Sequence, residues 1–187
     1  MLSDAIKQEI ESHIHEPEHR AAACTEALRI VQRERGWIDD ESLAEVAEFL
    51  GMSRHELDGV ATFFNLIHRR PVGRHVIRVC ASVSCWVMGY EGLREKLLAH
   101  LGVEMGETTA DGQFTLREVE CSGACVNAPV VQIGDDYYED VSPEHMETII
   151  DALKSGEIPK HGSQIGRQSS EPVGGPTTLK AFTTTAD

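Results

Sequence analysis

Four of the five cysteines form two short pairs, and these pairs are the part of the sequence best suited to chemistry. Cys80 and Cys85 are separated by four residues, and Cys121 and Cys125 by three. Thiolates placed in this way can form disulfides, bind zinc or bind iron. The choice depends on the redox compartment, on the spacing and on the elements that carry the two pairs.

Each pair is expected to follow a β-strand. Residues 75–80 (HVIRVC) are rich in β-branched side chains, and residues 114–120 (FTLREVE) also favour a strand. Apolar side chains at helical spacing from Tyr90 to Leu101 predict a helix between the two strands. Because neighbouring strands can end at the same edge of a sheet, both cysteine loops are expected to meet there. Gly123 allows the second loop to turn tightly.

The remainder of this region predicts a small α/β domain. Residues 130–133 and 137–141 flank Gly134-Asp135-Asp136, which is typical of a hairpin turn. A last helix is expected from Ser142, with Pro143 at its first position. It should bury Met146, Ile149, Ile150 and Leu153. The resulting order, β-α-β-β-β-α, predicts an α/β domain of thioredoxin-like size over residues 72–158.

The segments on either side differ from this domain. Residues 1–71 carry repeated apolar stripes at helical spacing and predict an N-terminal helical bundle that serves in docking. Its last helix should begin with a capping box formed by Ser53 and Glu56. Cys24, Trp37 and the Phe63-Phe64 pair are expected in its core. Residues 159–187 are rich in Ser, Gly, Pro and Thr, which predicts a flexible C-terminal tail.

Composition narrows the classes of function. The 187 residues include 17 Lys and Arg against 31 Asp and Glu, and the resulting net charge of −14 argues against nucleic acid and anionic membranes as partners. No apolar run approaches the roughly 18 residues of a membrane span. The acidic start of the chain does not have the pattern of a secretory signal. An odd number of cysteines, five, in a chain without such a signal indicates a reducing compartment, where thiols serve as metal ligands or catalysts.

Several interpretations of the cysteines remain open on spacing alone. A structural zinc site would also use four cysteines, although its knuckles are usually tighter. Two disulfides are unfavoured in a reducing compartment, and neither pair has the C-x-x-C spacing of a thioredoxin-type redox site. A [2Fe–2S] cluster takes two thiolates per iron, which two separated pairs supply, although the plant-type ferredoxin spacing is absent. The spacing favours the cluster over zinc.

A family resemblance extends this interpretation. The runs HVIRVCASVSCWVMG (75–89) and LREVECSGACVNAPVVQI (116–133), with the hairpin and helix that follow, resemble the thioredoxin-like [2Fe–2S] E-subunit of NADH–quinone oxidoreductase, the respiratory complex I. VAEFL (46–50) and GVATFFNLI (59–67) resemble that family's N-terminal bundle. The match covers roughly residues 15–158. The resemblance implies that Cys80, Cys85, Cys121 and Cys125 hold the cluster.

The resemblance also implies a function and a partner. The chain would be an electron-transfer subunit of the NADH dehydrogenase module, with its cluster near the FMN of the flavin subunit, the F-subunit of the complex, which also binds NADH. It would lie on the cytoplasmic side of the inner membrane through the complex, without inserting into it. NAD-linked hydrogenases and formate dehydrogenases use a similar subunit, so the assembly stays open.

The sequence shows no catalytic site of its own. It has no G-x-G-x-x-G after a strand and no Walker-type loop, which are the usual cradles for dinucleotide and nucleotide phosphates. NADH and FMN are therefore expected on the partner. A zinc-stabilised assembly module is the alternative of another class, and the colour of the purified protein separates it from the brown-red cluster form.

Overall fold

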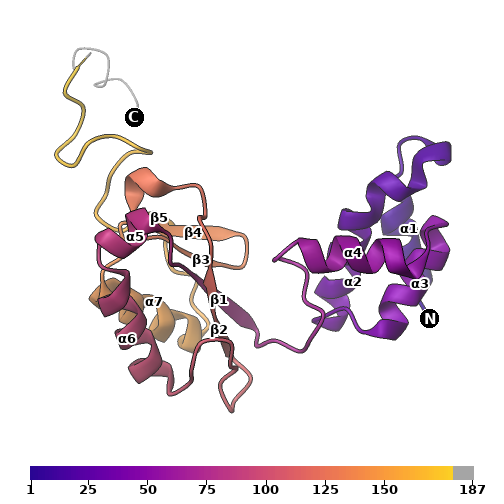
Figure 1. The fold of residues 1–187 in the computed structure, drawn as a ribbon, viewed down its shortest axis with the longest axis horizontal. Coiled ribbons are helices and arrows are strands. Elements are labelled where there is room, and N and C mark those ends of the chain that lie inside the picture. The colour runs from indigo at the N-terminus through magenta and orange to yellow at the C-terminus, as the bar shows by residue number, and fades with distance from the viewer. Residues whose placement is uncertain (179–187) are drawn as a thin grey trace. The chain divides into compact units, whose positions relative to one another are not determined.

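The computed structural model describes residues 1–178, which form two compact units (Figure 1). The first unit comprises Met1–Val72, and the second begins at Gly73. This division lies one residue beyond the one drawn from the sequence. In the described part of the chain, no helix is both long and apolar enough to cross a membrane.

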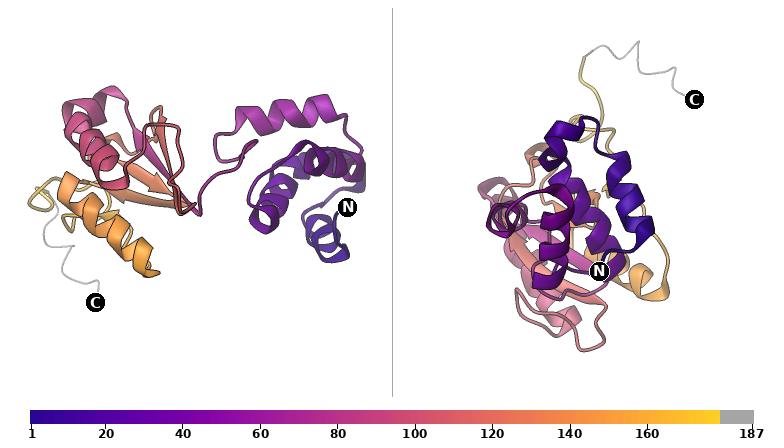
Figure 2. Two further views of the ribbon diagram at one scale, coloured as in Figure 1. Left: turned by 90° about the horizontal axis from the view of Figure 1, so that it is seen from below. Right: turned by 90° about the vertical axis from the view of Figure 1, so that its right-hand side faces the viewer.

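The first unit consists of helices, seen from two further sides in Figure 2. Its elements are α1 (Asp4–Ser12), the 3₁₀ helix η1 (Pro17–Ala23), α2 (Cys24–Arg35), α3 (Asp40–Leu50) and α4 (Arg54–Phe63). The helix starts follow from their capping residues. The Ser53 hydroxyl accepts from the backbone N–H of Glu56, whose carboxylate accepts from the backbone N–H of Ser53. The predicted capping box is thus confirmed.

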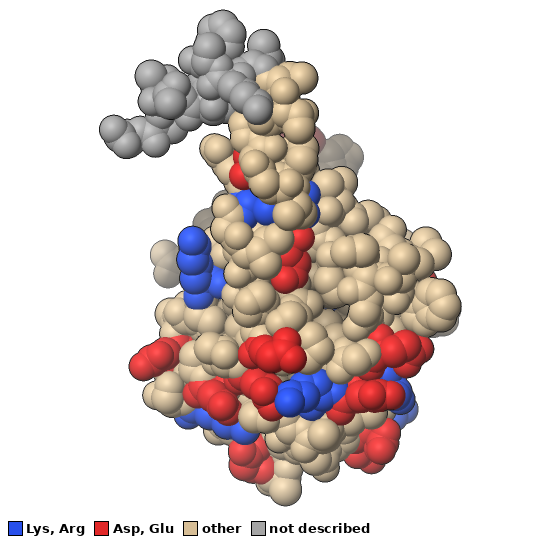
Figure 3. Space-filling model, turned by 90° about the vertical axis from the view of Figure 1, so that its left-hand side faces the viewer, with Lys and Arg blue, Asp and Glu red and all other residues tan. Residues whose placement is uncertain are grey.

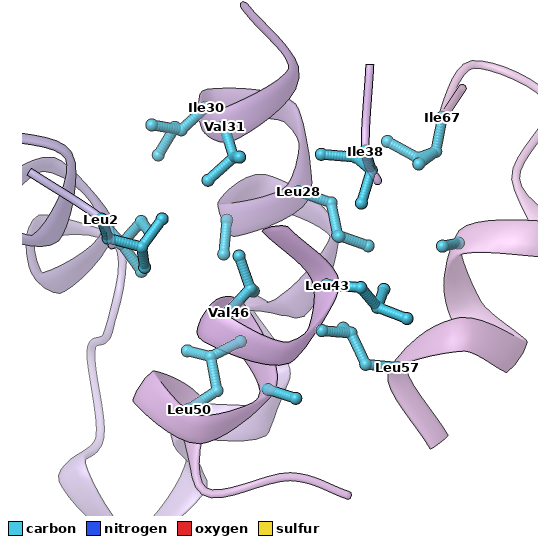
Figure 4. Packing of buried hydrophobic residues seen from close by; sticks show 14 of the residues in the cluster. Leu2, Leu28, Ile30, Val31, Ile38, Leu43, Val46, Leu50, Leu57 and Ile67 are labelled. Atoms are coloured by element: carbon cyan, nitrogen blue, oxygen red, sulfur yellow. The ribbon is translucent and has the colours of Figure 1, made fainter. Parts of the chain in front are cut away.

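Apolar side chains from all four α-helices form one core (Figure 4). Leu28 on α2, Val46 on α3 and Leu57 on α4 are fully or almost fully buried. Burial of this kind stabilises a fold by about 1.5–3 kcal/mol per large side chain. The half-buried Cys24 packs against the same core.

The expectation that Phe63 and Phe64 belong to this core is wrong. Their side chains are 81% and 43% exposed, and their rings contact each other edge to face at 5.1 Å between centroids. The reason lies in the backbone. Helix α4 ends at Phe63, and Phe64 already has extended torsion angles, so the apolar stripe stops after Ala61. Trp37 is only partly buried.

The second unit is built on a five-stranded mixed sheet. The strands are β1 (His75–Cys80), β2 (Phe114–Val119), β3 (Val131–Ile133), β4 (Asp136–Glu139) and β5 (Gly162–Ser163), in the order β2-β1-β3-β4-β5. Strands β1 and β2 are parallel, whereas β3 is antiparallel to both β1 and β4. The predicted hairpin is therefore confirmed as β3–β4.

Helices complete the second unit. They are α5 (Val83–Val87), α6 (Tyr90–Leu101) and α7 (Pro143–Ser155), with a short 3₁₀ turn, η2 (Cys125–Asn127). Apolar side chains of α6 and α7 form one core with the sheet residues Ile77 and Leu116. The predicted burial of Met146, Ile149, Ile150 and Leu153 is confirmed. The sheet and this helix pair thus form two layers.

The structure differs from the sequence-based prediction at the start of the expected tail. Gly162 and Ser163 form β5 and pair in parallel with Tyr138 and Glu139 of β4. This pairing uses backbone hydrogen bonds and an ion pair between Arg167 and Asp140, neither of which an apolar pattern reveals. The last nine residues of the predicted tail, 179–187, lie outside the described residues.

Two substitutions on α4 should separate core packing from surface exposure. Leu57→Ala should lower the free energy of unfolding of the helical unit by about 2–5 kcal/mol, because Leu57 is fully buried. Phe63→Ala should change it by less than about 0.5 kcal/mol, because this ring is exposed. Both can be measured by denaturant titration in a Trp86→Phe background, where Trp37 alone reports fluorescence. An equal loss for both variants would contradict the assigned burial.

Candidate metal centre

Strands β1 and β2 bring the two cysteine loops together. Cys80 is the last residue of β1 and pairs in register with Val119, the last residue of β2. Cys121 follows two residues later. Because the two strands are parallel, both loops leave the sheet at the same edge. The predicted meeting of the loops thus rests on strand register.

The first cysteine pair is buried. Cys80 and Cys85 are 3% and 1% exposed and pack with Ala128 and Val130. The backbone N–H of Cys80 donates to the carbonyl of Val130 at 3.1 Å, and Val130 directly follows the cis peptide bond between Ala128 and Pro129. Burial, and secondly a hydrogen bond with Cys80, raise the pKa of Cys85 to about 12. Cys85 is therefore a neutral thiol at pH 7 that must release its proton on binding a metal.

The second cysteine pair is exposed. The Sγ atoms of Cys121 and Cys125 lie 3.3 Å apart, and the backbone N–H of Gly123 donates to Cys121 Sγ at 3.4 Å. Gly123 has a φ of +84°, a conformation that strongly favours glycine. Its N–H group is the main cause of the lowered pKa of Cys121. A backbone donor thus stabilises negative charge on the sulfur of Cys121.

Helix α5 links the two pairs. The Ser84 side chain hydrogen-bonds with Cys125 and opposes the rise in the pKa of that thiol, which is caused mainly by Cys121. Cys125 also acts electrostatically on Cys85, and Cys80 on Cys125. The four sulfurs therefore lie within one neighbourhood. Cys24 packs against the core of the helical unit.

The donor set fits an iron–sulfur cluster. All five cysteines are free thiols. Within residues 1–178, no group of three or more His, Cys, Asp or Glu side chains is placed to hold a single metal ion. The structure instead offers two thiol pairs. A [2Fe–2S] cluster requires this arrangement, with two thiolates for each of two irons.

Exposed apolar side chains surround the cysteine loops, and the sequence analysis missed them. This apolar rim consists of Val83, Trp86, Val87, Met88 and Val126, each between 56% and 72% exposed. On the face shown in Figure 3, charged side chains gather in a band, and the surface between this band and the C-terminal segment carries few charges. The run VSCWVM (83–88) could have revealed the rim. It is mostly apolar, and a helix as short as α5 cannot bury apolar side chains on all of its sides.

The chain resembles proteins of one family over most of its length. The model of the thioredoxin-like [2Fe-2S] ferredoxin family matches residues 8–154. The chain belongs to this family. The E-subunit of NADH-quinone oxidoreductase from Pseudomonas aeruginosa is 43% identical over 152 residues, which are 81% of this chain and 92% of that protein. The E-subunit from Escherichia coli K12 is 41% identical over 153 residues, 82% of this chain and 92% of that protein.

A solved structure shares the fold. An NAD+-reducing [NiFe]-hydrogenase in the H2-reduced state aligns with a TM-score of 0.61 at 22% identity, over 71% of this chain and 23% of that chain. Together with the family match, this confirms the predicted thioredoxin-like α/β fold, and the curated relatives confirm the resemblance to the E-subunit. The family also decides between zinc and the [2Fe–2S] cluster in favour of the cluster.

The assignment of the four ligands remains a prediction with a direct measurement. Anaerobically purified protein should contain two irons and two sulfides, and reduction should give one S = 1/2 electron paramagnetic resonance (EPR) signal. Cys121→Ser should abolish or strongly alter this signal, because it removes one of two thiolates on an iron. Cys24→Ser is the matched control and should leave it unchanged. Stoichiometric zinc without iron would rule out the assignment.

Proposed function

We propose that this chain is the electron-transfer subunit of the NADH dehydrogenase module of NADH–quinone oxidoreductase, with Cys80, Cys85, Cys121 and Cys125 holding the cluster near the FMN of the flavin subunit. When bound, a [2Fe–2S] cluster accepts and returns one electron at a time. The observation that carries the proposal is that the exposed cysteines Cys121 and Cys125 lie beside the apolar rim. The similarity of the chain to the E-subunit supports the proposal.

The two cysteine pairs have different tasks in this proposal. Cys80 and Cys85 are fixed in the interior and anchor the site. Cys121 and Cys125 lie at the surface, where an electron donor can approach. The N–H group of Gly123 and the hydroxyl of Ser84 stabilise negative charge on these outer sulfurs. The exposed side is therefore the side that exchanges electrons.

The apolar rim suits a protein partner. Exposed clusters of large apolar side chains mark interaction sites, and aromatic and Met side chains are enriched in interface cores. Trp86 follows Cys85 within α5, Met88 directly follows this helix, and Val126 follows Cys125 directly. A partner that covers this rim would shield the outer sulfurs from water. The flavin subunit is the partner that we propose.

The flavin subunit would supply the electrons. Hydride transfer from NADH delivers two electrons, and a flavin is needed to separate them into single electrons. The sequence of the present chain carries no recognisable dinucleotide-binding loop. We therefore place NADH and FMN on the flavin subunit. We also propose that the complex holds this chain on the cytoplasmic side of the inner membrane. The alternative is that the chain is the equivalent subunit of an NAD-linked hydrogenase or formate dehydrogenase. Identification of the proteins that co-purify with it distinguishes these assemblies.

A charge placed in the apolar rim should weaken binding of the flavin subunit. Val126→Glu should reduce anaerobic co-purification with this partner at least roughly tenfold, because the partner would have to desolvate a carboxylate. Ile158→Glu is the matched control. It places the same charge at an exposed side chain beyond the far end of α7 and should not affect binding. If Val126→Glu binds the partner as the control does, the rim is not the interface.

The helical unit is proposed as a second docking element. Among the described residues of this unit, the exposed large apolar side chains are those of Met1, Phe63 and Phe64. The two Phe rings contact each other. Aromatic side chains of this kind often act as anchors in protein interfaces. Because α4 ends at Phe63 and Phe64 is extended, these rings do not enter the core of the unit and are available to a partner.

Removal of the two exposed rings should weaken the complex without unfolding the chain. The double variant Phe63→Ala, Phe64→Ala should lower the affinity for the flavin subunit roughly tenfold or more, measured with the purified proteins. His55→Ala removes an exposed ring from the other end of α4 and serves as control. Unchanged affinity of the double variant would show that the α/β unit carries the interface alone.

A further inference from the structure

The C-terminal segment adds contacts to the cluster site that the family model does not cover. That model ends at residue 154, whereas the structure places residues 162–173 against the α/β unit. After β5, this segment runs beside the loop that carries η2 (Figure 1). That loop contains Cys125 and leads into Val126 and Asn127. The contacts between the segment and this loop centre on one side chain, Arg167.

Arg167 makes three polar contacts while almost fully buried. Its Nη1 lies 2.8 Å from Asp140 Oδ1, and both side chains are only 8% exposed. The same nitrogen donates to the carbonyl of Val126 at 3.1 Å, and Nε donates to the carbonyl of Glu171 at 2.7 Å. A single guanidinium thus joins the residue after Cys125 to an acidic side chain and to the C-terminal segment.

Asp140 is held in place from both sides. The Ser163 hydroxyl donates to Asp140 Oδ2 at 2.7 Å and accepts from the backbone N–H of Arg167 at 3.1 Å. The backbone N–H of Asp140 donates to the carbonyl of Asn127 at 2.7 Å. Asp140 therefore connects β5 and Arg167 to the residue that ends η2.

Asn127 provides a second connection to the segment. Its side-chain amide donates to the carbonyl of Ser169 at 2.7 Å and to Glu139 Oε2 at 2.6 Å. Asn127 itself is only 4% exposed. Both residues that follow Cys125 are thus fixed by groups of the C-terminal segment, even though Cys125 itself lies at the surface.

We propose that Arg167 is a positioning residue for the cluster, which holds Cys125 in place through the Val126 carbonyl and sets the local charge together with Asp140. This inference rests on the proposed assignment of Cys125 as a ligand. An Arg side chain is required because its planar fork donates in several directions at once, whereas a Lys would provide a single charged nitrogen. The segment from β5 to Glu171 then acts as a clasp on the outer cysteine loop.

Loss of Arg167 should release this loop. In Arg167→Gln the cluster should be lost to an iron chelator roughly tenfold faster than in wild type, the change expected for about 1.4 kcal/mol of local stability. Arg167→Lys should restore part of the retention through Asp140. The rate of hydrogen exchange in residues 121–130 should be lowest in wild type, higher in Arg167→Lys and highest in Arg167→Gln, with or without the cluster. Arg74→Gln, the matched control, removes the same charge from the residue before β1, ~20 Å along the strand from Cys80.

The reduction potential of the cluster distinguishes an electrostatic effect of Arg167 from a purely structural one. Arg167→Gln leaves the buried carboxylate of Asp140 uncompensated, and its negative charge should oppose an added electron and lower the potential. Asp140→Asn leaves the Arg167 cation uncompensated and should raise it. A residue that only maintains the fold would not shift the potential in opposite directions. Both shifts can be measured by EPR-monitored redox titration against Arg74→Gln.

Clear outcomes overturn the proposal. They are a cluster-loss rate in Arg167→Gln equal to that of Arg74→Gln, or potentials that move in the same direction in both charge variants. If Arg167→Gln fails to fold, a chain ending at residue 160 retains every element that the family model matches. Wild-type cluster retention in that chain would equally overturn it. An unaltered EPR signal in Cys125→Ser would instead disprove the ligand assignment, and none of these measurements needs the flavin subunit.

Discussion

The parallel pairing of β1 with β2 is the constraint on which the cluster site depends. Six residues of each strand are in register, from His75 opposite Phe114 to Cys80 opposite Val119. A slip by one residue would turn every side chain of the moved strand to the other face of the sheet. A slip of β1 would take Ile77 and Val79 out of the core, and a slip of β2 would take out Leu116. Core packing therefore fixes the register and thereby the position of both cysteine loops. The α6 crossover that parallel pairing requires supplies that same core.

The unequal burial of the two cysteine pairs follows from this arrangement. Cys80 belongs to the strand itself, so its side chain is enclosed by the residues that pack against the sheet. Cys121 and Cys125 lie in the loop beyond the strand, where Gly123, Ser84 and the C-terminal segment contact them or their neighbours. The proposed function needs both conditions. In that proposal the inner pair is a rigid anchor, and the outer pair gives a short path to the partner.

Much of the fold could be predicted because apolar periodicity determines which side chains must be buried. The strand at residues 75–80, the β3–β4 hairpin and the buried face of α7 were all predicted from such patterns and local caps. The same pattern failed for Phe63 and Phe64. Periodicity shows that a ring is apolar, but it does not show where the helix ends or whether a partner covers the ring. The apolar rim around the cysteines was missed for the same reason.

The polar contacts of the C-terminal segment could not be predicted from the sequence, for a different reason. Their residues are of types that occur commonly on solvated loops, and their partners lie far away along the chain: Arg167 contacts Asp140 and Val126. Such contacts depend on β4 and η2 being in place first. A buried ion pair also adds little net stability compared with apolar packing. What it does provide is a defined geometry. That is the property required of the loop that carries Cys125, which lies at the surface without an apolar core of its own to hold it.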